Sequence, residues 1–128
     1  MDPIADMLIR IKNTIQLKKE IVIIPYSRFK ENILIVLKKE DYIENYKKII
    51  NGKRKFLRIY FKYDNNQPKI REIKKISNPG RRIYISAKKI SKVFRGFGLV
   101  IISTPKGVLS GKDAQKQGIG GELICQIW

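Results

Sequence analysis

The sequence predicts an α+β fold, because its apolar residues follow two different periodicities along the chain. Spacings of three and four residues are typical of helices that bury one face, whereas alternation is typical of half-buried strands. Short turn-forming segments separate these stretches. The 128 residues suit one compact domain or two very small ones, and a hydrophobic content of 43% is typical of a folded chain.

The first half of the chain predicts the element order αβαβββ. Its first helix, which Asp2 is suited to cap, has an apolar stripe at helical spacing. The stripe consists of Ile4, Leu8, Ile11 and Ile15. Residues 20–24 form the first predicted strand, which Pro25 stops. Ser27 then caps a second helix that ends near Glu40.

Three further strands complete the predicted first half. Residues 42–50 and 56–63 are strands on either side of the Asn51-Gly52 turn, and the second of them alternates apolar and basic side chains. Residues 64–68 form a turn. Residues 70–76 are predicted as a further strand or an extended link.

The second half predicts a short sheet with a short helix, after an internal boundary at residues 77–80 (Ser-Asn-Pro-Gly). In order, we expect a strand at 82–86, a helix at 88–95, a buried strand at 99–103, a loop at 104–110, a helical turn at 112–117 and a strand at 122–128. Cys125 is predicted to face inward as a small hydrophobic residue. Core positions are also predicted for Phe29, Phe56, Phe61 and Phe97, and Trp128 is expected to pack the last strand against the body.

The charge of the chain predicts a polyanionic partner. Twenty-eight basic residues against 11 acidic ones give a net charge of +17, and such an excess destabilises a compact chain through self-repulsion. Residues 69–95 carry ten basic residues and one acid, Glu72. An ordinary solvated face is the alternative, but acids do not balance this run. No long apolar run, secretory signal or lipidation motif points to a membrane, so we expect a cytosolic protein that binds RNA.

The residues that the chain lacks argue against an enzyme. Without histidine, neither a Ser-His or Cys-His nucleophile pair nor a zinc site of cysteine and histidine can form. The acids are scattered, so no metal site is expected, and no cofactor or small-molecule substrate. The single cysteine excludes an internal disulfide and fits a reducing compartment.

Two turns near the C-terminus are the candidate RNA-binding features. Ser103, Thr104, Lys106 and Gly107 follow a buried strand, and hydroxyl groups at such a place can bond base edges, the 2′-OH or phosphate. A second open turn contains Gly118, Gly120 and Gly121 and precedes Glu122. Spacing alone is equally compatible with two tight turns that have only a structural role.

Five sequence blocks together resemble the bacterial-type small-subunit ribosomal protein S-eight family. They are DPIADMLIRIKN at 2–13, PYSRFK at 25–30, NPGRRIY at 78–84, GFGLVIISTPKG at 96–107 and IGGELICQIW at 119–128. The resemblance implies two small domains: residues 1–76, with a secondary rRNA contact, and residues 77–128, with the main rRNA-binding surface. It further implies early binding to the central domain of small-subunit rRNA, next to proteins such as S-five and S-two. The expected location is on the ribosome, in the cytoplasm or in a plastid stroma.

The resemblance also implies which residues contact RNA. The first contact loop is Ser103, Thr104, Pro105, Lys106 and Gly107, in which Pro105 replaces the family's usual serine and removes a hydroxyl. The second is Gly120, Gly121 and Glu122. Glu122 either accepts from a base amino group or holds the Ser103–Gly107 loop through backbone amides; the second role is favoured because a carboxylate repels phosphate.

Weaker RNA-contact candidates lie elsewhere in the sequence. Tyr84 matches a family aromatic residue that can lie against RNA, and a core position is equally compatible with its place in a short strand. Arg82 and Lys88 flank it. In the first half, the candidates are Arg10, Asn13, Arg28 and Lys30, each of which is almost equally compatible with an ordinary solvated helix residue.

The expected function is that of a structural constituent of the small ribosomal subunit, which binds rRNA without turnover. The alternative is a free translational repressor or RNA chaperone that uses the same surface.

Overall fold

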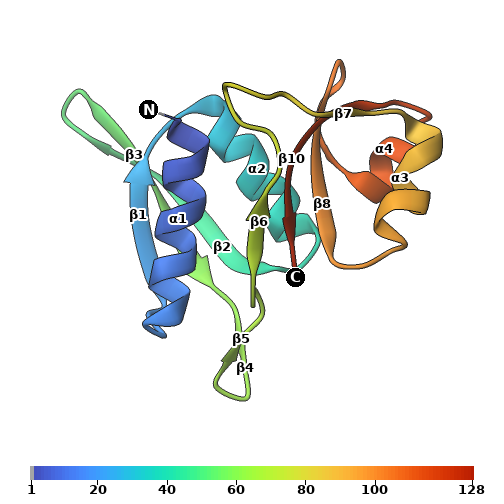
Figure 1. Ribbon diagram of the computed structural model, residues 1–128. Coiled ribbons are helices and arrows are strands. Elements are labelled where there is room, and N and C mark those ends of the chain that lie inside the picture. Colours follow the sequence, from blue (N-terminus) through green and yellow to red (C-terminus); the bar gives the residue numbers. More distant parts are fainter. Residues whose placement is uncertain (1) are drawn as a thin grey trace. The chain divides into compact units, whose positions relative to one another are not determined.

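A computed structural model describes residues 2–128, which form two compact units. The first is Pro3–Arg71, and the second is Glu72–Trp128 together with Asp2. Each contains helices and antiparallel sheet, so the predicted α+β class is confirmed (Figure 1). The division lies between Arg71 and Glu72, whereas the sequence break lies after residue 76. Residues 73–75 belong to the second unit because they pair with its last strand.

The first unit combines two helices with a three-stranded sheet. Its elements are α1 (Pro3–Gln16), β1 (Ile21–Pro25), α2 (Arg28–Lys39), β2 (Ile43–Asn51), β3 (Arg54–Phe61), β4 (Tyr63–Asp64) and β5 (Gln67–Pro68). The sheet has the order β1-β3-β2 and is antiparallel, and β4 and β5 form a separate hairpin. The predicted αβα start is observed. The strand predicted at 56–63 is divided, because β3 ends at Phe61 and Tyr63 lies in β4.

Local sequence explains these elements. Ser27 caps α2, since its Oγ accepts a hydrogen bond of 3.1 Å from the backbone N–H of Lys30. Leu8, Ile11 and Ile15 of the apolar stripe of α1 are buried, whereas Ile4 is half-buried. Also buried are the apolar residues Ile33, Leu34, Val36 and Leu37 of α2, and the alternating apolar face of β3, which consists of Leu57, Ile59 and Phe61. The register places Ile24 opposite Leu57 and Ile43 opposite Phe61, so both outer strands contribute to this core.

The second unit is built on a five-stranded sheet. Its elements are β6 (Ile73–Lys75), β7 (Tyr84–Ile85), α3 (Ala87–Phe94), β8 (Leu99–Thr104), β9 (Gly107–Ser110), α4 (Gly111–Lys116) and β10 (Gly121–Ile127). The order is β6-β10-β8-β9, and β7 also pairs with β10. Its core contains Ile90, Val100, Ile102, Ala114 and Leu123, which come from both helices and from β8 and β10.

Two predictions about this unit are wrong, and a third is confirmed. The predicted loop at 104–110 is wrong in its second part, because Gly107–Ser110 pairs with β8 as β9. Phe97 is wrong as a core residue: it is 56% exposed, and its ring lies 5.5 Å from that of Trp128 between centroids. Cys125 is fully buried as predicted, and burial raises the pKa of its thiol to about 12. Of the phenylalanines predicted as core residues in the first unit, Phe61 is buried, whereas Phe29 and Phe56 are half-buried.

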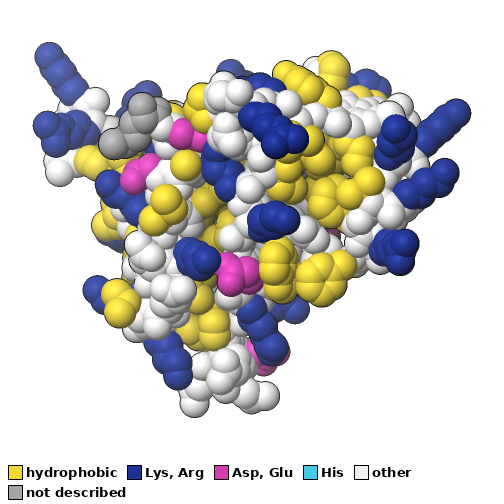
Figure 2. Space-filling model, in the orientation of Figure 1, with side chains coloured by type: hydrophobic (Ala, Val, Ile, Leu, Met, Phe, Trp, Pro, Cys, Tyr) yellow, Lys and Arg dark blue, Asp and Glu magenta, His cyan; other side chains and the backbone are white. Residues whose placement is uncertain are grey.

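None of the helices between residues 2 and 128 has the length and apolar character needed to span a membrane. Lys and Arg side chains stand out over the visible surface, with far fewer acidic ones between them (Figure 2).

Candidate nucleic-acid interface

Three strands of the second unit bring Tyr84, Glu122 and Ser103 side by side. Glu122 on β10 lies directly opposite Tyr84 on β7 and directly opposite Ser103 on β8. Directly opposed residues of antiparallel strands project from the same face, with Cβ atoms about 5 Å apart. We call these three residues the polar row.

The polar row lies on the face of the sheet that α3 and α4 do not cover. The adjacent positions Ile85, Leu123 and Ile102 alternate to the other face and pack with Ile90 and Ala114 of the two helices. The ring of Tyr84 is free for contact, since the residue is 70% exposed. This exposure excludes the alternative of a core tyrosine.

The β8–β9 hairpin presents the residues next to the polar row. Thr104 pairs with Gly107 across a turn formed by Pro105 and Lys106, which are both exposed. Oγ1 of Thr104 donates to the carbonyl of Gly107 at 2.7 Å and accepts from the backbone N–H of Lys106 at 3.1 Å. The Thr104 hydroxyl has therefore used its proton, and toward a ligand it can only accept.

The hydroxyl of Ser103 differs from that of Thr104. Within the part of the chain that the structure describes, it has no hydrogen-bond partner, and it is half-buried beside Glu122. It can therefore both donate and accept toward a ligand.

Arg82 is the partner of Glu122. Nη1 of Arg82 lies 3.1 Å from Oε2 of Glu122. The favoured role for Glu122, accepting from backbone amides of the Ser103–Gly107 loop, is not observed among residues 2–128. The pair neutralises a carboxylate that would otherwise repel phosphate, and the remaining guanidinium donors of Arg82 stay available.

Two glycines allow the strands of the polar row to approach. A Cβ at Gly121 would lie 2.1 Å from the carbonyl oxygen of Ser103, and one at Gly120 would lie 2.3 Å from the carbonyl oxygen of Ile85. Both glycines are thus required by backbone packing, whether or not they also touch a ligand.

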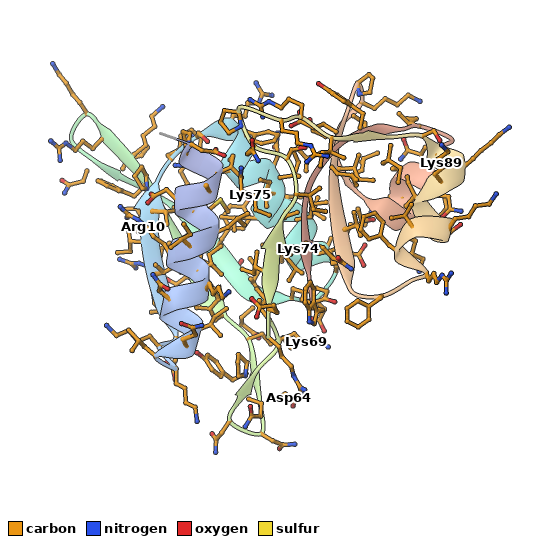
Figure 3. All side chains as sticks on the ribbon, viewed as in Figure 1. Arg10, Asp64, Lys69, Lys74, Lys75 and Lys89 are labelled. Carbon is orange, nitrogen blue, oxygen red and sulfur yellow. The ribbon has the colours of Figure 1, made fainter. Side chains whose placement is uncertain are left out.

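The segment that supplies Tyr84 and Ser103 to the polar row is rich in positive charge. No acidic residue occurs between residues 73 and 112, a segment that contains Arg82, Lys88 and Lys106. Lys88 and Lys106 are exposed, on the first turn of α3 and at the β8–β9 turn. Figure 3 shows further lysines of this unit, Lys89 on α3 and Lys74 and Lys75 on β6. Among residues 2–128, no cluster of three His, Cys, Asp or Glu residues is placed to hold a metal ion.

The candidates of the first unit form a separate and less uniform set. Arg10 lies on α1 (Figure 3) and is exposed, as is Asn13 on the same helix. Arg10 pairs with Asp6 at 3.2 Å. Arg28 is exposed at the start of α2. Lys30 is 5% exposed, and its Nζ donates to the carbonyl of Pro25 at 3.3 Å, so its ammonium is used within the fold.

Sequence reasoning missed two features of this interface. The Arg82–Glu122 pair joins the segment before β7 to β10, 40 positions later in the chain, and nothing in the sequence near either residue signals it. The internal use of the Thr104 hydroxyl was also missed, although threonine followed by a short turn to glycine is a common setting for such a bond.

The chain is similar to known proteins over almost its whole length. A model of the family described as "Ribosomal protein S8" matches residues 2–128. The protein named "Small ribosomal subunit protein uS8" from Dictyoglomus thermophilum is 46% identical over 127 residues, which cover 99% of this chain and 97% of the relative. The proteins of the same name from Thermus aquaticus and Kosmotoga olearia are 47% and 48% identical, over 99% of this chain and 98% of each relative.

Proposed function

The chain belongs to the ribosomal protein S8 family, and from this premise we propose that it binds the central domain of small-subunit rRNA and supports its assembly. The family consists of small-subunit ribosomal proteins that bind rRNA, and it is not a family of enzymes. The observation that carries the proposal is the polar row, whose one carboxylate, Glu122, is paired with Arg82, and whose other members, Tyr84 and Ser103, lie in an acid-free basic segment.

Attraction and selectivity have different sources in this proposal. Lysines and arginines release counterions from any RNA backbone, which gives affinity without sequence preference. Regular duplex RNA hides its base edges in a narrow groove, whereas an irregular helix exposes unstacked bases. The polar row is suited to such bases, because it offers an aromatic ring and hydroxyl groups together.

Each residue of the interface has a proposed role. The ring of Tyr84 stacks on an unpaired base or a sugar. Ser103 donates to a base edge or a 2′-OH, and Thr104 accepts from one. Arg82, held by Glu122, contacts phosphate together with Lys88 and Lys106. Gly107, Gly120 and Gly121 allow the backbone geometry, and Pro105 stiffens the turn, which lowers the entropy cost of ordering it.

The remaining proposals concern the first unit and the surroundings. Residues 77–128 provide the main rRNA surface, and residues 1–76 add a second contact through Arg10, Asn13 and Arg28. Lys30 is left out of this contact because its ammonium is bound to Pro25. Neighbouring small-subunit proteins such as S-five and S-two are the proposed protein partners, on ribosomes in the cytoplasm or in a plastid stroma.

Ser103→Ala tests the selective part of the interface. We expect about fivefold weaker binding to an RNA hairpin taken from an irregular helix of the central domain, with unstacked bases in an internal loop, since one neutral hydrogen bond contributes about 1 kcal/mol. Binding to a fully paired hairpin of the same length should not change. Lys106→Ala should instead weaken both and reduce the slope of log K against log salt by about 0.7 to 0.9.

The matched control is Ser91→Ala, which removes an exposed serine hydroxyl from α3 of the same unit. Filter binding over a series of KCl concentrations measures both affinity and slope. Equal losses on the two hairpins for Ser103→Ala would show that the polar row does not select the internal loop.

The alternative function is that of a free translational repressor or RNA chaperone with the same surface. Sedimentation of cell extracts separates the two. A ribosomal constituent is found with small-subunit particles, whereas finding most of the protein outside them would favour the alternative.

A further inference from the structure

The central strand of the first unit alternates basic and aromatic side chains on one face. Since successive residues of a strand point to opposite faces, Leu57, Ile59 and Phe61 face the core. The residues between them form the other series: Arg54, Phe56, Arg58 and Tyr60. We call the sheet surface that contains this series the outer face.

The two helices lie against the core face and not the outer face. On the core side, Tyr46 of β2 lies opposite Ile59, and its hydroxyl donates to Oε2 of Glu31 on α2 at 3.1 Å. No helix within the described part of this unit covers the outer face at its β1 edge. This is shown by Ile21 and Ile23, which remain 45% and 46% exposed there.

The strand register completes the outer face. Arg58 lies between Ile23 and Lys47, and Tyr60 lies between Ile21 and Asn45. Next along the sheet, Phe56 lies between Pro25 and Ile49. No acidic residue occupies these positions, so every charge in the three rows is positive.

The ring of Tyr60 presents a face to this surface. Nζ of Lys47, on the neighbouring strand β2, lies 5.8 Å from the ring centroid, so a cation of the outer face lies next to this ring. Nη1 of Arg58 lies 3.5 Å from the hydroxyl of Tyr60, so both side chains occupy the same part of the surface.

We propose that the outer face binds a segment of single-stranded RNA, with bases stacked on Phe56 and Tyr60 and phosphates held by Arg54, Arg58 and Lys47. A positively charged surface with stacking platforms is the common chemistry of single-strand binding. A protein partner would have to bury these three cations and supply an acid for each. The inference extends the proposed RNA binding to a surface of the first unit that is separate from the polar row.

The test uses the full chain and a 12-nucleotide adenosine RNA with one central 2-aminopurine, whose fluorescence is quenched when the base stacks. The variant Phe56→Leu/Tyr60→Leu keeps apolar side chains but removes the rings. We expect about tenfold weaker binding and loss of quenching, with an unchanged salt slope, because stacking is uncharged. Phe97→Leu, which removes an exposed aromatic ring from the second unit, is the matched control and should change affinity less than twofold.

A second variant carries the test if the leucine variant does not fold. Arg58→Gln/Lys47→Gln should reduce the salt slope by about 1.4, or about 0.7 per phosphate contact on a single strand. Lys38→Gln, an exposed lysine on α2, is its control and should leave the slope unchanged.

The outcomes separate this inference from the proposed function. Wild-type affinity and quenching in the leucine variant, or an unchanged slope in the glutamine variant, would overturn the inference and leave the outer face to a protein partner. Binding of the internal-loop hairpin depends on Ser103 and is unaffected by that result. If the wild-type protein bound the internal-loop hairpin no more tightly than the fully paired hairpin, that result would instead contradict the proposed function.

Discussion

At the scale of single residues, the geometry of the polar row depends on an ion pair and on a glycine. Arg82 lies 3.1 Å from the carboxylate of Glu122 and neutralises it, which removes a repulsion that the proposed phosphate contacts would otherwise meet. Ser103 reaches its place beside Glu122 because Gly121 lets the two backbones approach. The polar row therefore depends on Gly121, where any added side chain would push β8 and β10 apart.

Gly121→Ala should destabilise the second unit and remove RNA selectivity together. The added Cβ would lie 2.1 Å from a backbone oxygen, which no rotamer change can relieve, so β8 and β10 must separate. We expect the free energy of unfolding in urea to fall by about 3 kcal/mol, as for severe overpacking.

Gly80→Ala is the matched control for Gly121→Ala. Its Cβ would meet Oδ1 of Asn78 at 3.6 Å, an ordinary contact, so the free energy of unfolding should stay within about 0.5 kcal/mol of wild type. If Gly121→Ala were as stable as this control, the close approach of β8 and β10 would not be needed.

The sequence suggested which residues to consider at the candidate interface, and the structure supplies their hydrogen bonds and burial. Resemblance brought Ser103, Thr104 and Glu122 together as candidates, and the register places Ser103 beside Glu122. The hydrogen bonds of Thr104 and the burial of Lys30 depend on how the backbone closes around them. A lysine at a helix start gives no sign of whether its ammonium reaches water or a carbonyl.

At the scale of elements, length decided what could be predicted. The helices α1 and α2 and the strand β3 are long enough to show a period, and all three were expected near their observed bounds. The strands β6, β7 and β9 have two to four residues, which is too short for a periodic signal, so β6 and β7 were expected only within the longer segments 70–76 and 82–86, and β9 was missed. Whether such a short segment forms a strand depends on pairing with a distant part of the chain, as β6 and β7 pair with β10.

The helix caps give a prediction at the element scale. Ser27→Ala removes the hydrogen bond to the backbone N–H of Lys30 and should lower the free energy of unfolding by about 1 kcal/mol. Ser86→Ala is the matched control, because Ser86 occupies the same position before α3 without a side-chain cap bond. Urea unfolding followed by circular dichroism measures both. Equal losses for the two variants would contradict a stabilising role for the Ser27 hydroxyl.

At the scale of the whole molecule, the charge is not only large but constant around neutral pH. The chain has no histidine, the one side chain that ordinarily titrates there. Each resolved pKa shift moves the pKa of its group further from pH 7. A hydrogen bond from Lys62 lowers the pKa of Asp41, the same bond raises that of Lys62, and burial raises the pKa values of Tyr42, Tyr46, Tyr63 and Cys125.

Binding to fully paired duplex RNA should therefore be independent of pH between 5.5 and 7.0, below the range in which an α-amino group titrates, near about 7.7. A phosphodiester does not change its charge there, and a closed duplex has no unstacked base to protonate. At constant ionic strength, we expect dissociation constants within twofold over this range, measured by fluorescence anisotropy. The far-UV circular dichroism spectrum, recorded at each pH, controls for unfolding. A binding curve with a midpoint in this range would show a titrating group at the interface, which this set of side chains does not provide.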